Sequence, residues 1–291
     1  MVRAMPALFL AALLLGASSA ALSASADEAA APDHHIADPE DGTLAQGVYT
    51  NPYFALAYPL PAGWKEGLAG PPPSNAGYYV LNTPEPLGET KGTILIAAQD
   101  EFFALKPMAD AMAMLEDLHR SASETPGLTA ETAPQPLTIA GHGFARLDLG
   151  GVGLSRVIFA TLIRCHIVSF TFAASDPALL KKLASSIDRL SFDAEAKGAA
   201  PLCIDHYATD ATIRHKIAPA PVGPSFVKIP VRIVIGPDGK VKHVHVISAF
   251  PGQAKSIADA LSQWEFKPYE VQGEPVEIET GIVFEFKPTG R

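Results

Sequence analysis

Two histidines, His243 and His245, are the side chains whose type and spacing best suit a chemical site. If residues 240–248 form a strand, both rings lie on one face of a sheet, where they could bind Zn²⁺ or Cu²⁺. A metal site needs a third or fourth ligand, which the sequence does not identify; the alternative is two solvated histidines. The other histidines considered have no evident ligand partners and are expected at the surface or in turns: His34, His35, His142, His206 and His215.

Motifs for catalysis are missing from the sequence. It contains no G-x-S-x-G, H-E-x-x-H or C-x-x-C pattern. The glycine-rich residues 150–153 are not followed by a helical pattern, so they predict a hairpin loop instead of a phosphate cradle. We expect a protein that is not an enzyme and has no cofactor or metal. The alternative is a metal-binding or enzymatic protein whose acidic and histidine side chains converge between two domains.

The chain has two cysteines, Cys165 and Cys203. In an oxidising compartment an even pair favours a disulfide, which would connect the tip of a predicted hairpin to the start of the second domain. The alternative is two unrelated buried thiols.

The N-terminal residues are typical of a secretory signal. Arg3 precedes an apolar run at 7–15, and Ala24-Ser25-Ala26 fits a cleavage site. We expect residues 1–26 to be removed and the mature protein to be periplasmic or secreted, with no membrane span after cleavage. The alternative is an uncleaved inner-membrane anchor at 4–26. Residues 27–47 form an acidic tail, predicted to be disordered, whose carboxylates face no base.

Charge is distributed unevenly along the chain. Residues 1–200 hold 12 Lys and Arg against 21 Asp and Glu, giving −9, whereas residues 201–291 hold 10 of each. No basic stripe is present, so the composition argues against binding to nucleic acid.

Residues 48–193 predict an α+β domain. The apolar spacing at 106–121 indicates a helix, residues 135–149 a hairpin, and residues 154–163 and 166–173 two central strands. Asp176 followed by Pro177 indicates the start of a second helix. The order of elements, with Tyr49-Thr50-Asn51, Pro61-Ala62-Gly63-Trp64 and Leu190-Ser191-Phe192, resembles the Mog1/PsbP type of secreted domain. That resemblance implies an α/β/α sandwich with a mostly antiparallel sheet and a role in binding or assembly.

Residues 225–291 predict a small β-β-α-β domain, after a linker with a short helix at 194–224. Pro237-Asp238-Gly239 marks a hairpin turn, residues 253–264 have helical spacing, and residues 276–286 alternate like a strand. A helix is expected on one face of the sheet and water on the other.

This tail resembles the C-terminal domain of the TonB energy-transducer family, on the evidence of Pro237-Asp238-Gly239, Trp264-Glu265-Phe266-Lys267-Pro268 and Gly273-Glu274-Pro275-Val276. The resemblance implies capture of a peptide or protein partner, such as an outer-membrane TonB-dependent transporter, by addition of a strand. The residues it implies are Gly281, Ile282, Val283, Phe284, Glu285 and Phe286, with Trp264 and Phe266 in support. The chain has no long proline-rich rod, so energy transduction is not expected; an anchored transducer remains the alternative.

Overall fold

The computed structural model describes residues 36–286, except 69, 90, 131, 194–199 and 224–225. The predicted signal segment, residues 27–35 of the predicted acidic tail, and His34 and His35 lie outside the described residues. Within the described part of the chain, every helix is too short or too polar to cross a membrane. Below, the N-terminal region is residues 36–193 and the C-terminal module is residues 200–286.

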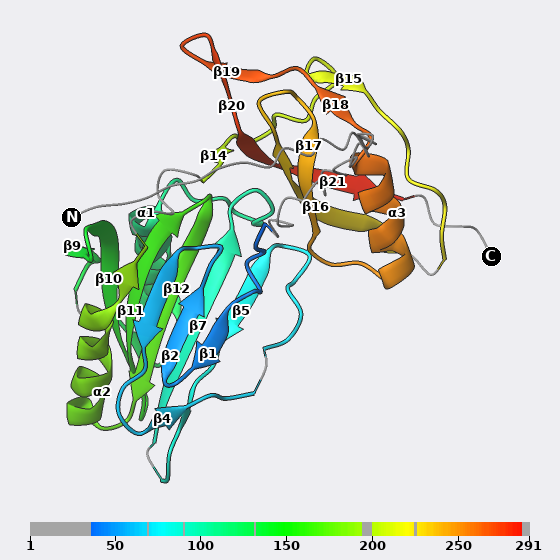
Figure 1. Cartoon of the computed structure of the whole chain (residues 1–291). Coiled ribbons are helices and arrows are strands. Elements are labelled where there is room, and N and C mark those ends of the chain that lie inside the picture. Colours follow the sequence, from blue (N-terminus) through cyan, green and yellow to red (C-terminus); the bar gives the residue numbers. More distant parts are fainter. Residues whose placement is uncertain are drawn as a thin grey trace, which may run out of the picture. The chain divides into compact units, whose positions relative to one another are not determined.

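A large antiparallel sheet organises the N-terminal region (Figure 1). Its strand order is β5-β7-β12-β11-β10-β8, with β9 paired to β10 beside β8. The strands are β5 (Tyr78–Asn82), β7 (Gly92–Asp100), β8 (Leu128–Thr129), β9 (Gln135–Ile139), β10 (His142–Gly151), β11 (Ser155–Ile163) and β12 (His166–Ala174). The predicted hairpin at 135–149 and the two central strands are therefore confirmed.

Helix α1 (Ala111–Glu124) covers one face of this sheet through Leu115 and Ala122. It begins five residues later than the sequence spacing predicts. Asp110 is the reason, because its side chain accepts a hydrogen bond from Ala113 N and caps the helix there.

The opposite face is covered by two kinds of element. Helix α2 (Pro177–Ala184) and the 3₁₀ helix η1 (Ser185–Arg189) cover part of it, and Asp176 caps α2 as predicted. A second antiparallel sheet, β1-β2-β3-β13, contributes Tyr49 and Tyr58 to the same core. Its strands are β1 (Thr43–Ala45), β2 (Val48–Asn51), β3 (Leu56–Pro59) and β13 (Ser191–Phe192). The predicted α/β/α sandwich is thus only partly correct, because a small sheet shares one outer layer with α2 and η1.

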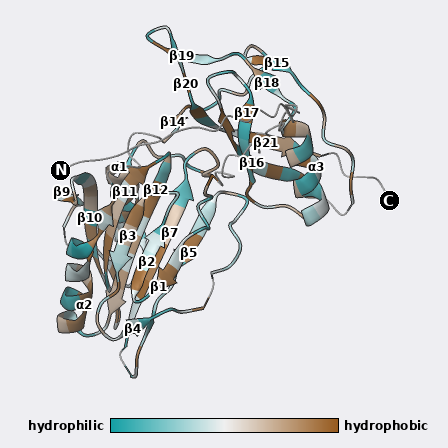
Figure 2. Cartoon of the chain, in the orientation of Figure 1, coloured by the Kyte–Doolittle hydropathy of each residue, from teal (hydrophilic) through white to brown (hydrophobic). Residues whose placement is uncertain are grey.

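A pair of two-residue strands, β4 (Trp64–Lys65) and β6 (Glu85–Pro86), completes the N-terminal region. Helix α2 and a later helix, α3 (Pro251–Leu261), both show hydrophilic and hydrophobic stretches side by side, as expected for helices with one buried face (Figure 2).

The C-terminal module contains the predicted β-β-α-β order with additional short strands. Its main sheet has the order β14-β21-β16-β17, in which only β14 and β21 run parallel. The elements are β14 (Leu202–Cys203), β15 (Ile213–His215), β16 (Lys228–Ile235), β17 (Val241–Val246), α3 (Pro251–Leu261), β18 (Glu265–Phe266), β19 (Tyr269–Val271), β20 (Glu274–Val276) and β21 (Ile278–Glu285).

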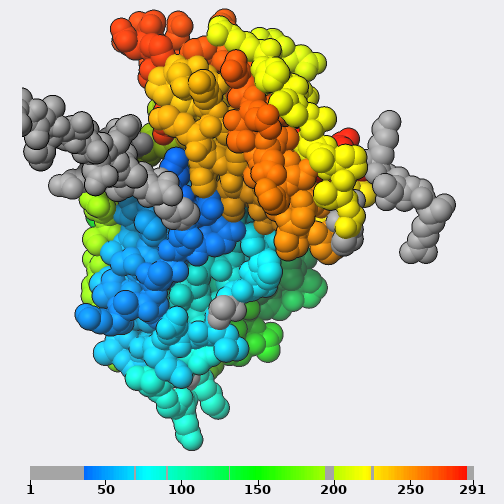
Figure 3. Space-filling view, turned by 45° about the vertical axis from the view of Figure 1, so that its right-hand side comes forward, coloured from blue at the N-terminus to red at the C-terminus, as the bar shows by residue number. Residues whose placement is uncertain are grey.

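The stretch predicted to be a linker with a short helix belongs instead to this module. The described residues of 200–223 form β14 and β15, and Ile204, Tyr207 and Ile213 pack on the module's core. The same stretch continues along α3, where Ser256 Oγ donates to Ala220 O at 2.8 Å and Trp264 Nε1 to Ile217 O at 2.7 Å. Figure 3 shows this stretch in yellow beside α3 in orange.

The turn between β16 and β17 explains why the Pro-Asp-Gly sequence is required. Gly239 has φ +80°, and a Cβ there would lie 2.2 Å from the Phe266 carbonyl oxygen. Only glycine satisfies both the left-handed backbone and the close approach of residue 266. The motif therefore connects the hairpin to the segment that follows α3.

Candidate functional site

The centre of the C-terminal sheet face opposite α3 is buried, which corrects the prediction that this face is open to water. Arg232 on β16 and Glu279 on β21 are only 1% and 2% exposed. The alternation of residues 276–286 predicts that Glu279 lies on this face, which was expected to be in contact with water. The N-terminal region covers it, because Tyr53 and Arg164 contact Glu279 and Asp100 contacts Arg232.

Four charged side chains form a buried cluster on this face. Arg232 Nη1 lies 2.7 Å from Asp100 Oδ2, and Arg232 Nε lies 3.2 Å from Glu279 Oε1. Arg164 Nη2 lies 3.0 Å from Glu279 Oε2. Two guanidinium groups therefore balance two carboxylates, as burial of charge requires. We call Asp100, Arg164, Arg232 and Glu279 the ionic cluster.

The surroundings determine the protonation of the groups around the cluster. Burial opposes ionisation of Glu279, but Arg232 and Arg164 outweigh it, so the pKa of Glu279 is lowered. Burial raises the pKa of Asp100 despite its contact with Arg232. Burial likewise raises the pKa of Tyr53, whose hydroxyl donates to Glu279 Oε1 at 2.9 Å. Burial, followed by the charge of Arg232, lowers the pKa of His166, so its ring is neutral.

The tip of the β11–β12 hairpin connects the N-terminal region to the C-terminal module. Arg164 and Cys165 have φ values of 48° and 55°, a left-handed pair usually occupied by Asn-Gly. Arg164 belongs to the ionic cluster, and Cys165 forms a disulfide with Cys203, with Cα atoms 6.0 Å apart. The predicted disulfide is therefore present, and both residues of one turn contact the module.

The two histidines of β17 have acidic partners from the N-terminal segment. His243 Nε2 lies 2.7 Å from Asp38 Oδ1, and His245 Nε2 lies 3.2 Å from Glu40 Oε1. The acidic tail was predicted to be disordered and without basic partners. The described part of this tail instead forms β1 and the two contacts with the histidines. It therefore covers the face of the C-terminal sheet that carries them.

These side chains do not converge as metal ligands do. The ring of His245 lies between two carboxylates, since its Nδ1 is 3.7 Å from Asp38 Oδ1 while its Nε2 is near Glu40. Within residues 36–286, as far as they are described, no group of three or more His, Cys, Asp or Glu side chains is arranged to hold a metal ion. His142 packs against Phe192, with ring centroids 3.8 Å apart.

We expect the contact at His245 to make stability depend on pH. Burial favours the neutral ring and Arg232 repels a charge, but Glu40 and Asp38 outweigh them, so the pKa of His245 is raised. The Tyr79 ring packs near that of His245, with centroids 6.2 Å apart, and His243 lies on the same face of β17. A pKa raised on folding stabilises the protein below the unfolded value of about 6.5, and this contribution is lost as pH rises through the folded pKa.

Urea unfolding of the wild type and of Glu40→Gln, measured at pH values below and above about 6.5, checks this pH dependence. The wild type should lose more stability than the variant as the pH increases above about 6.5. Parallel curves for the two proteins would contradict it.

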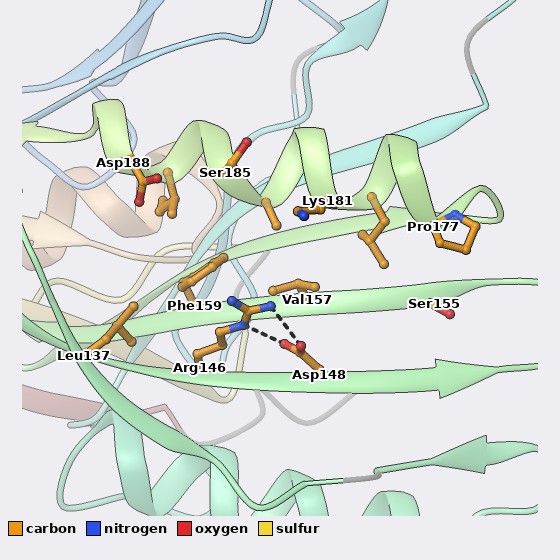
Figure 4. Close-up of a pocket in the computed structure, with 13 residues that line it drawn as sticks. Leu137, Arg146, Asp148, Ser155, Val157, Phe159, Pro177, Lys181, Ser185 and Asp188 are labelled. Atoms are coloured by element: carbon orange, nitrogen blue, oxygen red, sulfur yellow. Dashed lines mark hydrogen bonds and ion pairs between the residues drawn. The ribbon is translucent and has the colours of Figure 1, made fainter.

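A surface groove in the N-terminal region, about 490 Å³ in volume, lies between α2 and strand β11 (Figure 4). Val157 and Phe159 lie along it, and Arg146 and Asp148 lie at its rim. The two charged groups neutralise each other through bonds of 2.7 and 2.8 Å. The lining also includes Ser155, Lys181, Ser185 and Asp188.

The last strand carries the residues predicted to contact a partner. The carbonyls of Glu277 and Glu279 accept hydrogen bonds from Leu202 N and Ile204 N, beside β14. Main-chain groups alternate in direction along a strand, so those of Gly281, Val283 and Glu285 also point away from β16. β14 pairs only with Ile278 and Glu279, and no other described strand pairs with this side of β21. We call residues 281–285 on this side the open edge.

The side chains of the last strand differ in their environment. Val283 is 50% exposed, and Glu285 forms an exposed ion pair with Lys228 at 3.2 Å. The apolar side chains on the α3 face are partly buried against the module's core: Ile282, Phe284 and Phe286.

Trp264 and Phe266 lie inside the core of the module. They are 2% and 1% exposed, so neither can contact a partner directly. They support the last strand by packing against it: the ring centroids of Trp264 and Phe284 lie 5.9 Å apart.

The sequence patterns did not predict the ionic cluster. One signal was available: Arg232 lies within the run Pro230–Ile235, whose other residues are all apolar. A charged side chain in such a strand indicates a buried partner, although it does not identify that partner.

Comparison with known families bears on the C-terminal module. Residues 228–288 match the family model of the Gram-negative bacterial TonB protein C-terminal. The resemblance carried by the Pro-Asp-Gly turn and by the segments around Trp264 and Gly273 is thus confirmed. The TonB C-terminal match covers the main sheet except β14, and it includes the open edge.

Among solved structures, the solution structure of cyanobacterial PsbP (CyanoP) from Synechocystis sp. PCC 6803 is similar to this chain. The identity is 14%, the TM-score is 0.36, and the match covers 50% of this chain and 91% of that one. No curated protein matches the chain.

Proposed function

We propose that this is an exported, non-enzymatic protein whose TonB-like C-terminal module binds an extended segment of a partner protein along the open edge. The observation that carries the proposal is the half-paired last strand. β14 occupies one side of Ile278 and Glu279, while the main-chain groups of Gly281, Val283 and Glu285 on that side have no strand partner among the described residues. Such an edge accepts an additional strand through main-chain hydrogen bonds.

Two further observations support the proposal. The match to the TonB C-terminal family covers the whole of β21. The four members of the ionic cluster pair with one another and are largely removed from solvent, which suits a structural contact better than a reaction with a substrate. We propose segments of outer-membrane transporters as the partners, because proteins with TonB C-terminal domains interact with such transporters.

Fluorescence polarisation with labelled peptides from the periplasmic segments of outer-membrane transporters tests the proposal. At least one peptide should bind more tightly than its scrambled counterpart. Val283→Pro should abolish this binding, because proline removes an outward-facing N–H of the open edge. If none of the peptides binds more tightly than its scrambled counterpart, the proposal is refuted.

Val283→Thr is the matched control for the proline variant. It changes the side chain but keeps the N–H, so binding should change by less than about threefold. Both substitutions lie at an edge position where the N–H does not pair with β16, so the melting temperatures of both variants should stay near that of the wild type. A proline variant that folds and binds normally would place the binding site elsewhere.

We further propose that export removes the N-terminal signal. Mass spectrometry of the protein purified from the periplasm should give a chain that begins near Asp27. A chain that retains residues 4–26 would favour an anchored transducer instead.

A further inference from the structure

The loop after β7 lies directly against the open edge. Gly281 is the first residue of that edge, and a Cβ on it would lie 2.9 Å from Phe102 Cβ and 2.9 Å from Phe103 Cζ. The loop therefore occupies the sheet face opposite α3 at the position where the open edge begins. Any larger residue at position 281 would displace it.

The ionic cluster holds this loop in place. Asp100 accepts a hydrogen bond from Phe102 N at 2.8 Å through Oδ1, while its Oδ2 contacts Arg232. The Asp100 carbonyl accepts from Ala104 N at 3.1 Å. The ring of Phe102 lies over the Arg232 guanidinium, 4.4 Å from ring centroid to Cζ. Phe102 is therefore fixed relative to both β7 and β16.

The loop presents apolar side chains at the surface, next to the charged Lys106. Phe102 is only partly buried, and Leu105, three residues later, is 96% exposed. Val283, the next residue on the same face of β21, is 50% exposed. A strand added to the open edge directs every second side chain to this face, where Phe102 and Phe103 are the described residues that lie against Gly281.

From these contacts we infer that the N-terminal region takes part in partner recognition: Phe102 contacts one side chain of the captured segment and selects an apolar residue at that position. The inference rests on the proposed capture of an extended peptide and adds a determinant of selectivity. The ligand class is an extended peptide with an apolar side chain at the position facing Phe102. A polar side chain there would lose its water without gaining a hydrogen bond from the phenyl ring.

The test uses the full-length protein and a peptide that binds the wild type. Each position of the peptide is replaced in turn by Leu and by Ser, and the ratio of the two affinities is measured. One position should prefer Leu by about tenfold, as expected for burial of one apolar side chain. Phe102→Ala should reduce the ratio at that position to near one and leave the ratios at the other positions unchanged. Phe102→Leu, which keeps an apolar surface, should retain the preference.

Phe250→Ala is the matched control. Phe250 is 36% exposed and stacks on Phe226, with centroids 4.5 Å apart, so its loss removes an aromatic ring without affecting the open edge. Failure of all peptides to bind the wild type would refute strand capture itself. Binding with the same Leu preference in Phe102→Ala would refute the role of Phe102 and leave strand capture standing. A uniform loss at all positions would also refute the selectivity role, because it would indicate a purely structural contribution.

Discussion

Arg232→Ala should destabilise the protein by about 3–5 kcal/mol, the cost of leaving buried carboxylates without a counter-charge. Arg232 is 1% exposed and contacts both Asp100 and Glu279. Its removal would leave Asp100 with the ring of His166, 3.6 Å away, in place of a guanidinium, and would leave Glu279 with Arg164. The melting temperature should fall by about 6–20 °C, given about 2–4 °C per kcal/mol for a chain of this size.

Two variants test the cause of this loss. Arg146→Ala removes an arginine that also forms a two-bond contact with a carboxylate, but Arg146 is 41% exposed and its partner Asp148 50%. This control should cost about 1 kcal/mol or less. Arg232→Met combined with Asp100→Asn removes both members of one buried pair and should be less destabilising than Arg232→Ala. Equal losses for Arg232→Ala and Arg146→Ala would show that the ionic cluster is not buried in solution.

Reduction of the Cys165–Cys203 disulfide should lower the free energy of unfolding by about 4 kcal/mol, from the entropy that a closed loop removes from the unfolded chain. The bond joins residues 38 positions apart and connects the β11–β12 hairpin to β14. Urea unfolding with and without a phosphine reductant measures the effect. The curve should shift to lower urea in the reduced protein.

The double variant Cys165→Ala/Cys203→Ala serves as the control. The chain contains only these two cysteines, so the reductant should have no effect on the variant. The variant should match the reduced wild type in stability. An oxidised and a reduced wild type of equal stability would contradict the expected contribution of the disulfide.

Local patterns in the sequence predicted the elements well. The hairpin turns at Ala140-Gly141, Arg164-Cys165 and Asp238-Gly239 are set by residues adjacent in the chain, and all three are present. The start of α1 was misplaced because residues 106–110 fit the apolar spacing, while the cap at Asp110 decides where the helix begins. The stretch before β16 was misread because its apolar residues pack on a core formed later in the chain.

The candidate site was less predictable because its contacts join distant parts of the sequence. Glu279 is separated by 226 residues from Tyr53 and by 115 from Arg164. His243 and Asp38 are separated by 205 residues. Alternation in β21 correctly placed Glu279 on the face opposite α3, but no local pattern indicates that another part of the chain covers this face. Strand periodicity distinguishes the two faces of a sheet and does not identify what each one contacts.

The two-residue turn at Arg164 and Cys165 also has a mechanical consequence. A partner strand bound to β21 and then pulled would transmit force into β14 and β16, which pair with it. From β14 the force would pass through the disulfide to β12. From β16 it would pass through the ion pair between Arg232 and Asp100 to β7. These are interior strands of the large sheet. The module would therefore resist detachment under tension, and a cut in the chain between the two cysteines would still leave one covalent molecule.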